Sequence, residues 1–225
     1  MNFQRSEEEW LAVCDKITRG HCAPGDNSGP QATYWEAKSM RPLICVPPHP
    51  RDHVFDLGCG NGRLAMALIL HGFENVRYIG VDPVPESIEF CREAFRPWPN
   101  FEFIHVPLKT PTYTPNQSCN PLTWAFPLNP ASVDWAAALS VFTHLQTDAL
   151  AAHYVEEFRR VLKPGGVLWS TWFRSPPNVS TPIVERTVYL EAWIVNALRG
   201  FHWEATWGGS GTTQHDQWNI FARKI

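Results

Sequence analysis

A glycine-rich turn constrains this chain more than any other feature of its sequence. Residues 54–65 read VFDLGCGNGRLA, in which Gly58, Gly60 and Gly62 alternate with other residues. The apolar run before them predicts a buried strand, and the run after them predicts a helix. Because glycine has no Cβ, such a turn lets a ligand approach the backbone closely. The pattern therefore predicts a ligand site at the carboxyl end of a strand.

Two acids near this turn bear on which ligand it holds. The two classes to consider are nicotinamide or flavin dinucleotides and S-adenosylmethionine. Asp56 lies two residues before Gly58, where it would repel a pyrophosphate but suits the ammonium group of S-adenosylmethionine. Asp82 ends the run YIGVD and can accept hydrogen bonds from the ribose hydroxyls of either class. The alternative role for Asp82 is to cap the helix that follows.

Strand-like and helix-like runs alternate from residue 53 onward, which predicts an α/β fold with a parallel, doubly wound sheet. No helix separates the last two strands, so we expect them to pair antiparallel at one edge. The expected architecture is a doubly wound, Rossmann-like, seven-stranded sheet with an antiparallel last strand. The expected strands cover residues 53–57, 76–82, 101–106, 132–140, 167–173, 201–207 and 217–225, and two of the expected helices cover 147–163 and 181–200.

Two segments lie outside this alternation. Residues 1–50 carry no alternating β pattern, and Ser6 with Glu9 forms a capping-box pattern at the start of a helix. We expect 1–50 to form a helical N-terminal cap and 51–225 to form the ligand-binding domain. Residues 107–130 contain six prolines and little periodicity. A connection of this length is usually functional or disordered.

Four runs, in this order and spacing, resemble the class I S-adenosylmethionine-dependent methyltransferases: FDLGCGNGRLA, YIGVD, SVFTHL and FRRVLKPGGVLW. The resemblance covers residues from about 54 to 225. The run PTYTPN, followed by WAFPLNPASVDWAAALSVFTHL, is similar to a subgroup of small-molecule methyltransferases. The resemblance implies an enzyme that uses S-adenosylmethionine to methylate an oxygen or nitrogen of a small-molecule acceptor.

The resemblance also implies roles for particular residues. Asp56, Gly58 and Gly60, with Cys59 in the same turn, would line the methionine end of the cofactor. Asp82 would bind the ribose, with Pro83 beside it, and Leu139 and Ser140 would lie near the methyl group. Family members often place an acid after the third strand to bind the adenine amino group, but here His105 and Val106 occupy that position. A backbone group or His105 would have to serve the adenine instead.

Methyl transfer needs a base only where the acceptor must lose a proton. His144 follows the fourth strand, where ligands of open α/β sheets gather, so it is the first candidate base; a structural role capping the next helix is the alternative. His215 and Asp216 follow the run GGSGTT and form a second candidate, a base with its orienting carboxylate. The alternative for them is a turn leading into the last strand.

Aromatic residues are the candidates for the acceptor pocket. Tyr34 and Trp35 in the cap, Tyr113 in the proline-rich stretch and Trp172 after the fifth strand could wall it. Core packing is the alternative for such residues. His49 and His53 flank Asp52 in a spacing that suggests metal binding, but the neighbouring prolines prevent the helix that would align them. We expect no metal site.

Charge and composition limit which partners and which cellular compartment we expect. The 225 residues carry a formal net charge of −3 and have a pI near 6.3, so we expect neither nucleic acid nor a membrane surface as partner. The N-terminal run has no apolar signal-peptide core, and the six scattered cysteines favour reduced thiols. We therefore expect a cytoplasmic protein, with a homodimer left open. Two rival functions stay open as well: a dinucleotide-dependent oxidoreductase, and a catalytically silent protein that binds the cofactor.

Overall fold

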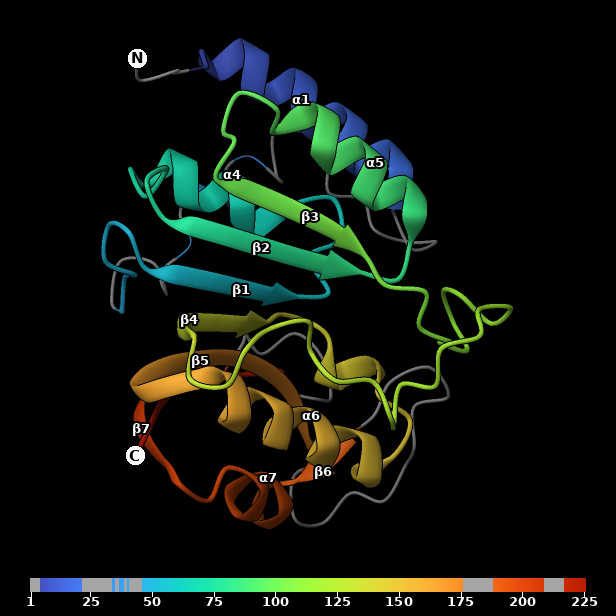
Figure 1. Cartoon of the computed structure of the whole chain (residues 1–225), viewed down its shortest axis with the longest axis vertical. Coiled ribbons are helices and arrows are strands. Elements are labelled where there is room, and N and C mark those ends of the chain that lie inside the picture. The colour runs from blue at the N-terminus through green and yellow to red at the C-terminus, as the bar shows by residue number, and fades with distance from the viewer. Residues whose placement is uncertain are drawn as a thin grey trace.

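The computed structural model describes residues 5–21, 34, 37, 38, 40, 46–175, 188–208 and 217–225. Within them a single sheet is flanked by helices on both faces, and Figure 1 shows α1, α4 and α5 on one side and α6 and α7 on the other. The elements are α1 (Glu7–His21), β1 (His53–Leu57), α4 (Arg63–Leu70), β2 (Arg77–Asp82), α5 (Pro85–Ala94), β3 (Phe101–His105), β4 (Val133–Ala138), the 3₁₀ helix η1 (Phe142–His144), α6 (Asp148–Val161), β5 (Leu162–Ser175), β6 (Val188–Leu190), α7 (Glu191–Ala197), β7 (Phe201–Gly208) and β8 (Gln217–Lys224).

The strand order confirms the predicted doubly wound sheet. It runs β3-β2-β1-β4-β5-β8-β7, and β6 adds a short pairing to β5. The pairs among β1 to β5 are parallel, whereas β8 runs antiparallel to both β5 and β7. The antiparallel last strand is therefore confirmed, although β7 rather than β8 lies at the edge. The order reverses between β1 and β4, the place where open α/β sheets bind ligands.

Alternation along the strands divides the core into two halves. Val54 and Tyr78 pack with α1, α4 and α5, whereas the next residues, Phe55 and Ile79, pack with α6. Successive side chains of a strand point to opposite faces, so each buried strand supplies both halves. Whether a residue holds an odd or even position along its strand therefore decides which face of the sheet its side chain points to.

The N-terminal helix packs on the same core as the sheet. Its capping box is formed as predicted: the Ser6 amide donates to the Glu9 carboxylate at 2.7 Å, and the Glu9 amide donates to Ser6 Oγ at 3.2 Å. Trp10 stacks on Trp98, with ring centroids 5.7 Å apart, and Figure 1 shows α1 beside α5. The part of the cap expected to form a second helix lies largely outside the described residues.

Two helix boundaries differ from the prediction. The helix expected over 147–163 ends at Val161, and β5 begins at Leu162. The helix expected over 181–200 is described from residue 188 onward: there Val188–Leu190 pairs in parallel with β5, and α7 covers Glu191–Ala197. The sequence of this stretch is helix-like, but hydrogen bonding to the neighbouring strand overrides local propensity.

Candidate active site

The glycine turn forms the floor of a cleft at the carboxyl ends of the central strands. Gly58, Gly60 and Gly62 have φ values of 72°, 51° and 82°, a left-handed region that side chains other than glycine rarely adopt. An added Cβ at Gly58 would lie 2.6 Å from Val141 Cγ2, and one at Gly62 would lie 2.4 Å from the Phe95 ring. At Gly60 nothing lies within 4 Å. Gly60 therefore presents bare backbone to open space.

The cleft has a volume of about 440 Å³, and its walls are largely apolar. Six segments build it: the glycine turn, the end of β2, Val106 directly after β3, the proline-rich stretch, the region after β4, and α6. Its lining residues are Leu57, Gly58, Gly60, Val81, Asp82, Pro83, Val84, Val106, Leu108, Thr110, Pro111, Thr112, Tyr113, Leu139, Ser140, Val141, His144, Leu145 and Tyr154.

Asp82 is the acid of the cleft wall. It is buried, and its two oxygens are held separately: Oδ2 accepts from the Gly60 amide at 2.8 Å, and Oδ1 accepts from the Val84 amide at 2.9 Å. Pro83 and Val84 line the cleft beside it. The bond to Val84, at the start of α5, matches the alternative capping role, yet the residue also faces the cleft. The capping contact and the position facing the cleft therefore coexist in one residue.

Asp56 and Cys59 lie behind the glycine turn rather than in the cleft, which corrects the placement expected for their side chains. The Tyr78 hydroxyl donates to Asp56 Oδ2 at 2.6 Å, and burial raises the pKa of Asp56 to about 7. The Cys59 thiol is directed to the carbonyl of Gly60, as is the Cys91 thiol at 3.4 Å. Both predicted residues therefore support the turn from the α4 and α5 side of the sheet.

The two residues predicted to lie at the adenine position, His105 and Val106, differ in where they lie. Val106 lines the cleft, and its amide donates to the Asp82 carbonyl at 3.1 Å. The His105 ring instead lies with Nε2 3.2 Å from the Pro83 carbonyl and is absent from the lining described above. Of the two alternatives for this position, the structure does not place the His105 ring in the cleft, because the ring is engaged with the backbone beside Asp82.

The region after β4 brings together three predicted residues, Leu139, Ser140 and His144. Ser140 has a φ of 59°, and its amide donates to Thr171 Oγ1 at 2.6 Å. His144 Nε2 lies 3.5 Å from the hydroxyl of Tyr113, and the two rings meet edge to face with centroids 5.6 Å apart. The structure thus brings His144, a candidate base, next to Tyr113, a candidate residue of the acceptor pocket.

Two of the remaining candidates, Trp172 and Tyr34, are described by the structure, and neither lines this cleft. The Trp172 ring is fully buried, stacks on Phe142 at 3.8 Å and donates from Nε1 to Ser170. Tyr34 packs in the core with α1 and α4. For these two residues the core-packing alternative holds. Trp35, His215 and Asp216 lie outside the described residues.

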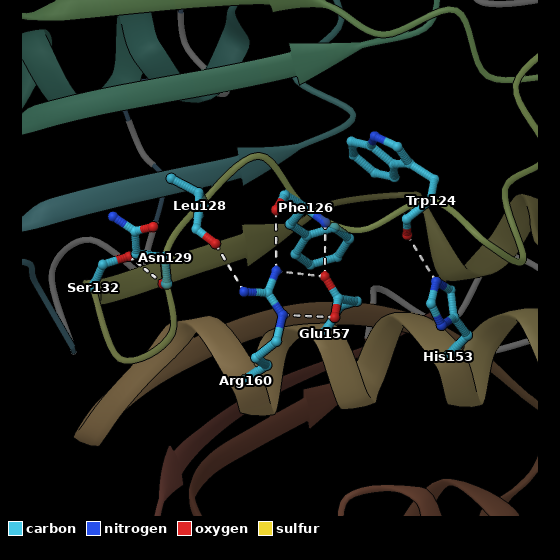
Figure 2. A network of polar contacts seen from close by, with 8 residues as sticks. All are labelled: Trp124, Phe126, Leu128, Asn129, Ser132, His153, Glu157 and Arg160. Carbon is cyan, nitrogen blue, oxygen red and sulfur yellow. Dashed lines mark hydrogen bonds and ion pairs between the residues drawn. The ribbon is translucent and has the colours of Figure 1, made fainter.

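The proline-rich stretch is built into the site. Its first half lines the cleft from Leu108 to Tyr113. Its second half is fixed to α6, as Figure 2 shows: Glu157 accepts from the Phe126 amide at 2.7 Å, and Arg160 donates to the carbonyls of Phe126 and Leu128 at 3.0 and 2.8 Å. Of the two expectations for a connection of this length, disorder is therefore wrong for residues 107–130.

Sequence reasoning missed several lining residues. Val84 directly follows Pro83, and Leu108, Thr110 and Thr112 lie within or shortly before the run PTYTPN, so nearness in sequence to predicted residues could have indicated all four. Tyr154 comes from α6, one helical turn before the core residue Phe158, and its helical spacing indicates only core packing.

No group of three potential metal ligands occurs among the residues that the structure places. The imidazole of His53 lies 2.9 Å from the Ser132 carbonyl, and the Asp52 carboxylate accepts from the His49 amide. Within the described part of the chain, every helix is too short or too polar to cross a membrane.

Comparisons with known proteins agree with this geometry. A family model described as a methyltransferase domain matches residues 55–170. EEF1A lysine methyltransferase 4 of Mus musculus is 34% identical over 80 residues, which is 36% of this chain and 31% of the mouse protein. The match thus spans less than a third of that relative.

Two solved structures share the fold over nearly the whole chain. The [4+2]-cyclase SpnF has a TM-score of 0.69 at 15% identity, covering 96% of this chain and 93% of its own. The N-methyltransferase NodS from Bradyrhizobium japonicum WM9, in complex with S-adenosyl-L-homocysteine, has a TM-score of 0.63 at 12% identity, covering 97% and 99%. At such identities the likeness shows the fold.

Proposed function

The chain belongs to the methyltransferase-domain family of S-adenosylmethionine-dependent enzymes, and from that premise we propose that it methylates an oxygen or nitrogen of a small-molecule acceptor. The observation that carries the proposal is the meeting of Tyr113 and His144 in an apolar cleft, next to Leu139 and Ser140. An acceptor held there would have apolar walls and a group able to take its proton.

The cleft fits the cofactor on two observations. Gly60 offers bare backbone with open space where a Cβ would stand, and Asp82 presents its carboxylate to the same cleft. Asp82 would accept the ribose hydroxyls, and Val84 and Val106 would cover the adenine. When bound, S-adenosylmethionine supplies an electrophilic methyl group on a sulfonium. The protein's own part is to orient the acceptor, exclude water and remove a proton; alignment alone can contribute about 7–11 kcal/mol.

The oxidoreductase rival loses its support. A parallel last strand would have favoured it, whereas β8 pairs antiparallel with β5, and the family model is that of a methyltransferase domain. A catalytically silent protein stays as an outcome of the test below.

One observation favours a second candidate acceptor, a lysine side chain of a protein. The curated relative from mouse carries the name of a lysine methyltransferase. The similarity covers only 36% of this chain. A match of that extent does not identify the methyl acceptor. The apolar walls favour the small-molecule acceptor, because a lysine ammonium would lose its hydration on entering between them.

The first experiment is calorimetric titration with S-adenosylmethionine, S-adenosylhomocysteine and the reduced nicotinamides. We expect binding of the first two alone. The protein is then incubated with methyl-tritiated S-adenosylmethionine and a cell extract divided into small-molecule and protein fractions. Label in the small-molecule fraction supports the proposal, and label in protein lysines overturns it in favour of the second candidate. Cofactor binding without label in either fraction indicates the silent protein.

A further inference from the structure

The Tyr113 phenol and the His144 imidazole meet at the cleft, although they are 31 residues apart in sequence. Tyr113 comes from the proline-rich stretch, and His144 ends η1. The phenolic oxygen lies 3.5 Å from Nε2, and the rings are edge to face. Hydrogen bonds between catalytic groups are often long before substrate binds, so this separation is one that a bound acceptor can tighten.

We propose that Tyr113 and His144 form a proton relay, in which the Tyr113 phenol takes the acceptor's proton and passes its own to His144 Nε2. The proposal deepens the function above and rests on it, because the acceptor must stand beside Leu139 and Ser140. It assigns direct contact with the acceptor to Tyr113 and makes His144 the final base.

The position of Tyr113 is fixed by the residues around it. Thr110 and Thr114 bracket it, with their Oγ1 atoms 2.9 Å apart and the Thr114 amide donating to the Thr110 carbonyl at 3.0 Å. Thr114 is buried, and its hydroxyl donates to the Leu108 carbonyl at 2.6 Å. This five-residue turn therefore holds the phenol at the cleft without help from a ligand.

His144 is fixed from the opposite side. Its amide donates to the Val141 carbonyl at 2.8 Å, within the turn that follows β4. The buried hydroxyl of Tyr189 donates to the carbonyl of Phe142 at 3.1 Å, which ties η1 to β6. Both partners of the relay thus sit on hydrogen-bonded backbone, as a group that must meet a reacting atom requires.

Exposure gives the relay its direction. The Tyr113 side chain is 47% exposed and lines the cleft, so it can touch an acceptor and also return the proton to solvent after the reaction. His144 also lines the cleft but is less exposed, so it can keep the proton until the product leaves.

The other titratable residues among the described lining serve less well. Asp82 is assigned to the ribose hydroxyls, and each of its oxygens already accepts from a backbone amide. Tyr154 is buried, and burial raises its pKa further above its ordinary value.

The step balances in atoms and charge. The acceptor oxygen or nitrogen forms a bond to the methyl carbon, and the carbon–sulfur bond breaks with its electron pair left on sulfur. The acceptor's proton goes to Tyr113, whose own proton goes to His144 Nε2. One positive charge is lost at sulfur and one appears on the imidazole, so the apolar cleft holds the same net charge before and after transfer. A low-dielectric site favours such charge conservation.

The test compares four variants in single-turnover methyl transfer to the acceptor found in the small-molecule fraction: Tyr113→Phe, His144→Gln, the double variant, and His71→Gln as control. His71 is the control histidine: its imidazole Nε2 lies 3.1 Å from the carbonyl of Ala37, a core residue on the α1 and α4 side of the sheet, and it does not line the cleft. We expect each relay variant to lose about 10²–10⁴-fold in rate and the double variant to lose no more than the slower single one. The control should stay within about twofold.

Two further readouts separate the relay from a structural role. Wild type should show a solvent deuterium isotope effect with a curved proton inventory, because two protons move together, and Tyr113→Phe should lose the curvature. Affinity for S-adenosylhomocysteine, measured by calorimetry, should change less than about threefold in every variant. An unchanged rate in Tyr113→Phe, or single losses that multiply in the double variant, overturns the relay alone. Absence of transfer by wild type to any small molecule overturns the proposed function, and the relay with it.

Discussion

Replacing Glu157 by alanine tests whether the proline-rich stretch is held in place by α6. Glu157 is buried and accepts three hydrogen bonds: one from the Phe126 amide at 2.7 Å, and two from Arg160, at 2.8 and 2.6 Å (Figure 2). Removing the Glu157 side chain leaves the buried Phe126 amide unsatisfied, which lowers the free energy of unfolding by about 1–3 kcal/mol. It also leaves the Arg160 guanidinium without its carboxylate partner. Breaking a fully buried ion pair costs about 3–5 kcal/mol.

The Arg160 side chain is 30% exposed, so water recovers part of that second cost. We therefore expect Glu157→Ala to lower the free energy of unfolding by about 2–3 kcal/mol. For a chain of this size each kcal/mol lowers the melting temperature by about 2–4 °C, which gives a shift of about 4–12 °C. Urea unfolding followed by circular dichroism measures the free energy, and hydrogen exchange at the Phe126 amide reports the local release.

The neighbouring acid provides the control. Glu156 also pairs with an arginine of the same helix, Arg159, but its side chain is 68% exposed, so Glu156→Ala should cost under about 0.5 kcal/mol. The Arg160 guanidinium lowers the pKa of Glu157 below its ordinary 4.5. The stabilisation is therefore complete above that value and is lost as the pH falls through the lower folded pKa. Equal stabilities for the two variants at pH 7, or an unchanged difference in strong acid, would refute the reasoning.

Three further predictions concern the cofactor end. Asp82→Ala should weaken S-adenosylmethionine binding at least about tenfold in calorimetry, since it removes the acceptor of the ribose hydroxyls; unchanged affinity would show that Asp82 serves only as a cap. Gly60→Ala should weaken cofactor binding, because its Cβ would point into the open space that the cofactor would fill. Gly72 has a similar positive φ but lies away from the cleft, so Gly72→Ala should share only the backbone strain and keep the cofactor affinity. Because the folded pKa of Asp56 is raised to about 7 from 3.8, the stability of the protein should fall as the pH rises between these values. Asp56→Asn should flatten that segment of the urea-unfolding profile, and a variant that keeps the slope would assign it to another group.

Much of the fold could be predicted from local pattern. The expected strand at 53–57 coincides with β1, because a short apolar run before a glycine turn has few other ways to bury itself. The stretch from 188 to 190 shows the limit. Its helix-like spacing is real, but the hydrogen-bonding edge of β5 decides its structure, and that edge is remote in sequence. Non-local pairing overrides propensity where the two conflict.

The cofactor end was predicted better than the positions of individual side chains. Gly58, Gly60 and Asp82 line the cleft as expected, because backbone geometry at a strand end fixes them. Asp56 does not line it, and strand parity gives the reason: its side chain shares a face with that of Val54, two residues earlier, and meets Tyr78 there. Counting residues back from the turn would have found this.

The acceptor end could not have been assembled from the sequence, because long-range contacts set it. The turn that carries Tyr113 is positioned by the bridge between Leu108 and Cys119, and its partner His144 is positioned by a hydroxyl from β6. Different contacts therefore position the residues at the two ends of the cleft. Substitutions between residues 110 and 114 should change which acceptor is methylated while the cofactor affinity holds, and substitutions at Gly60 or Asp82 should lower activity toward every acceptor equally. A variant of the 110–114 turn that lost cofactor affinity would show that the two ends are one site.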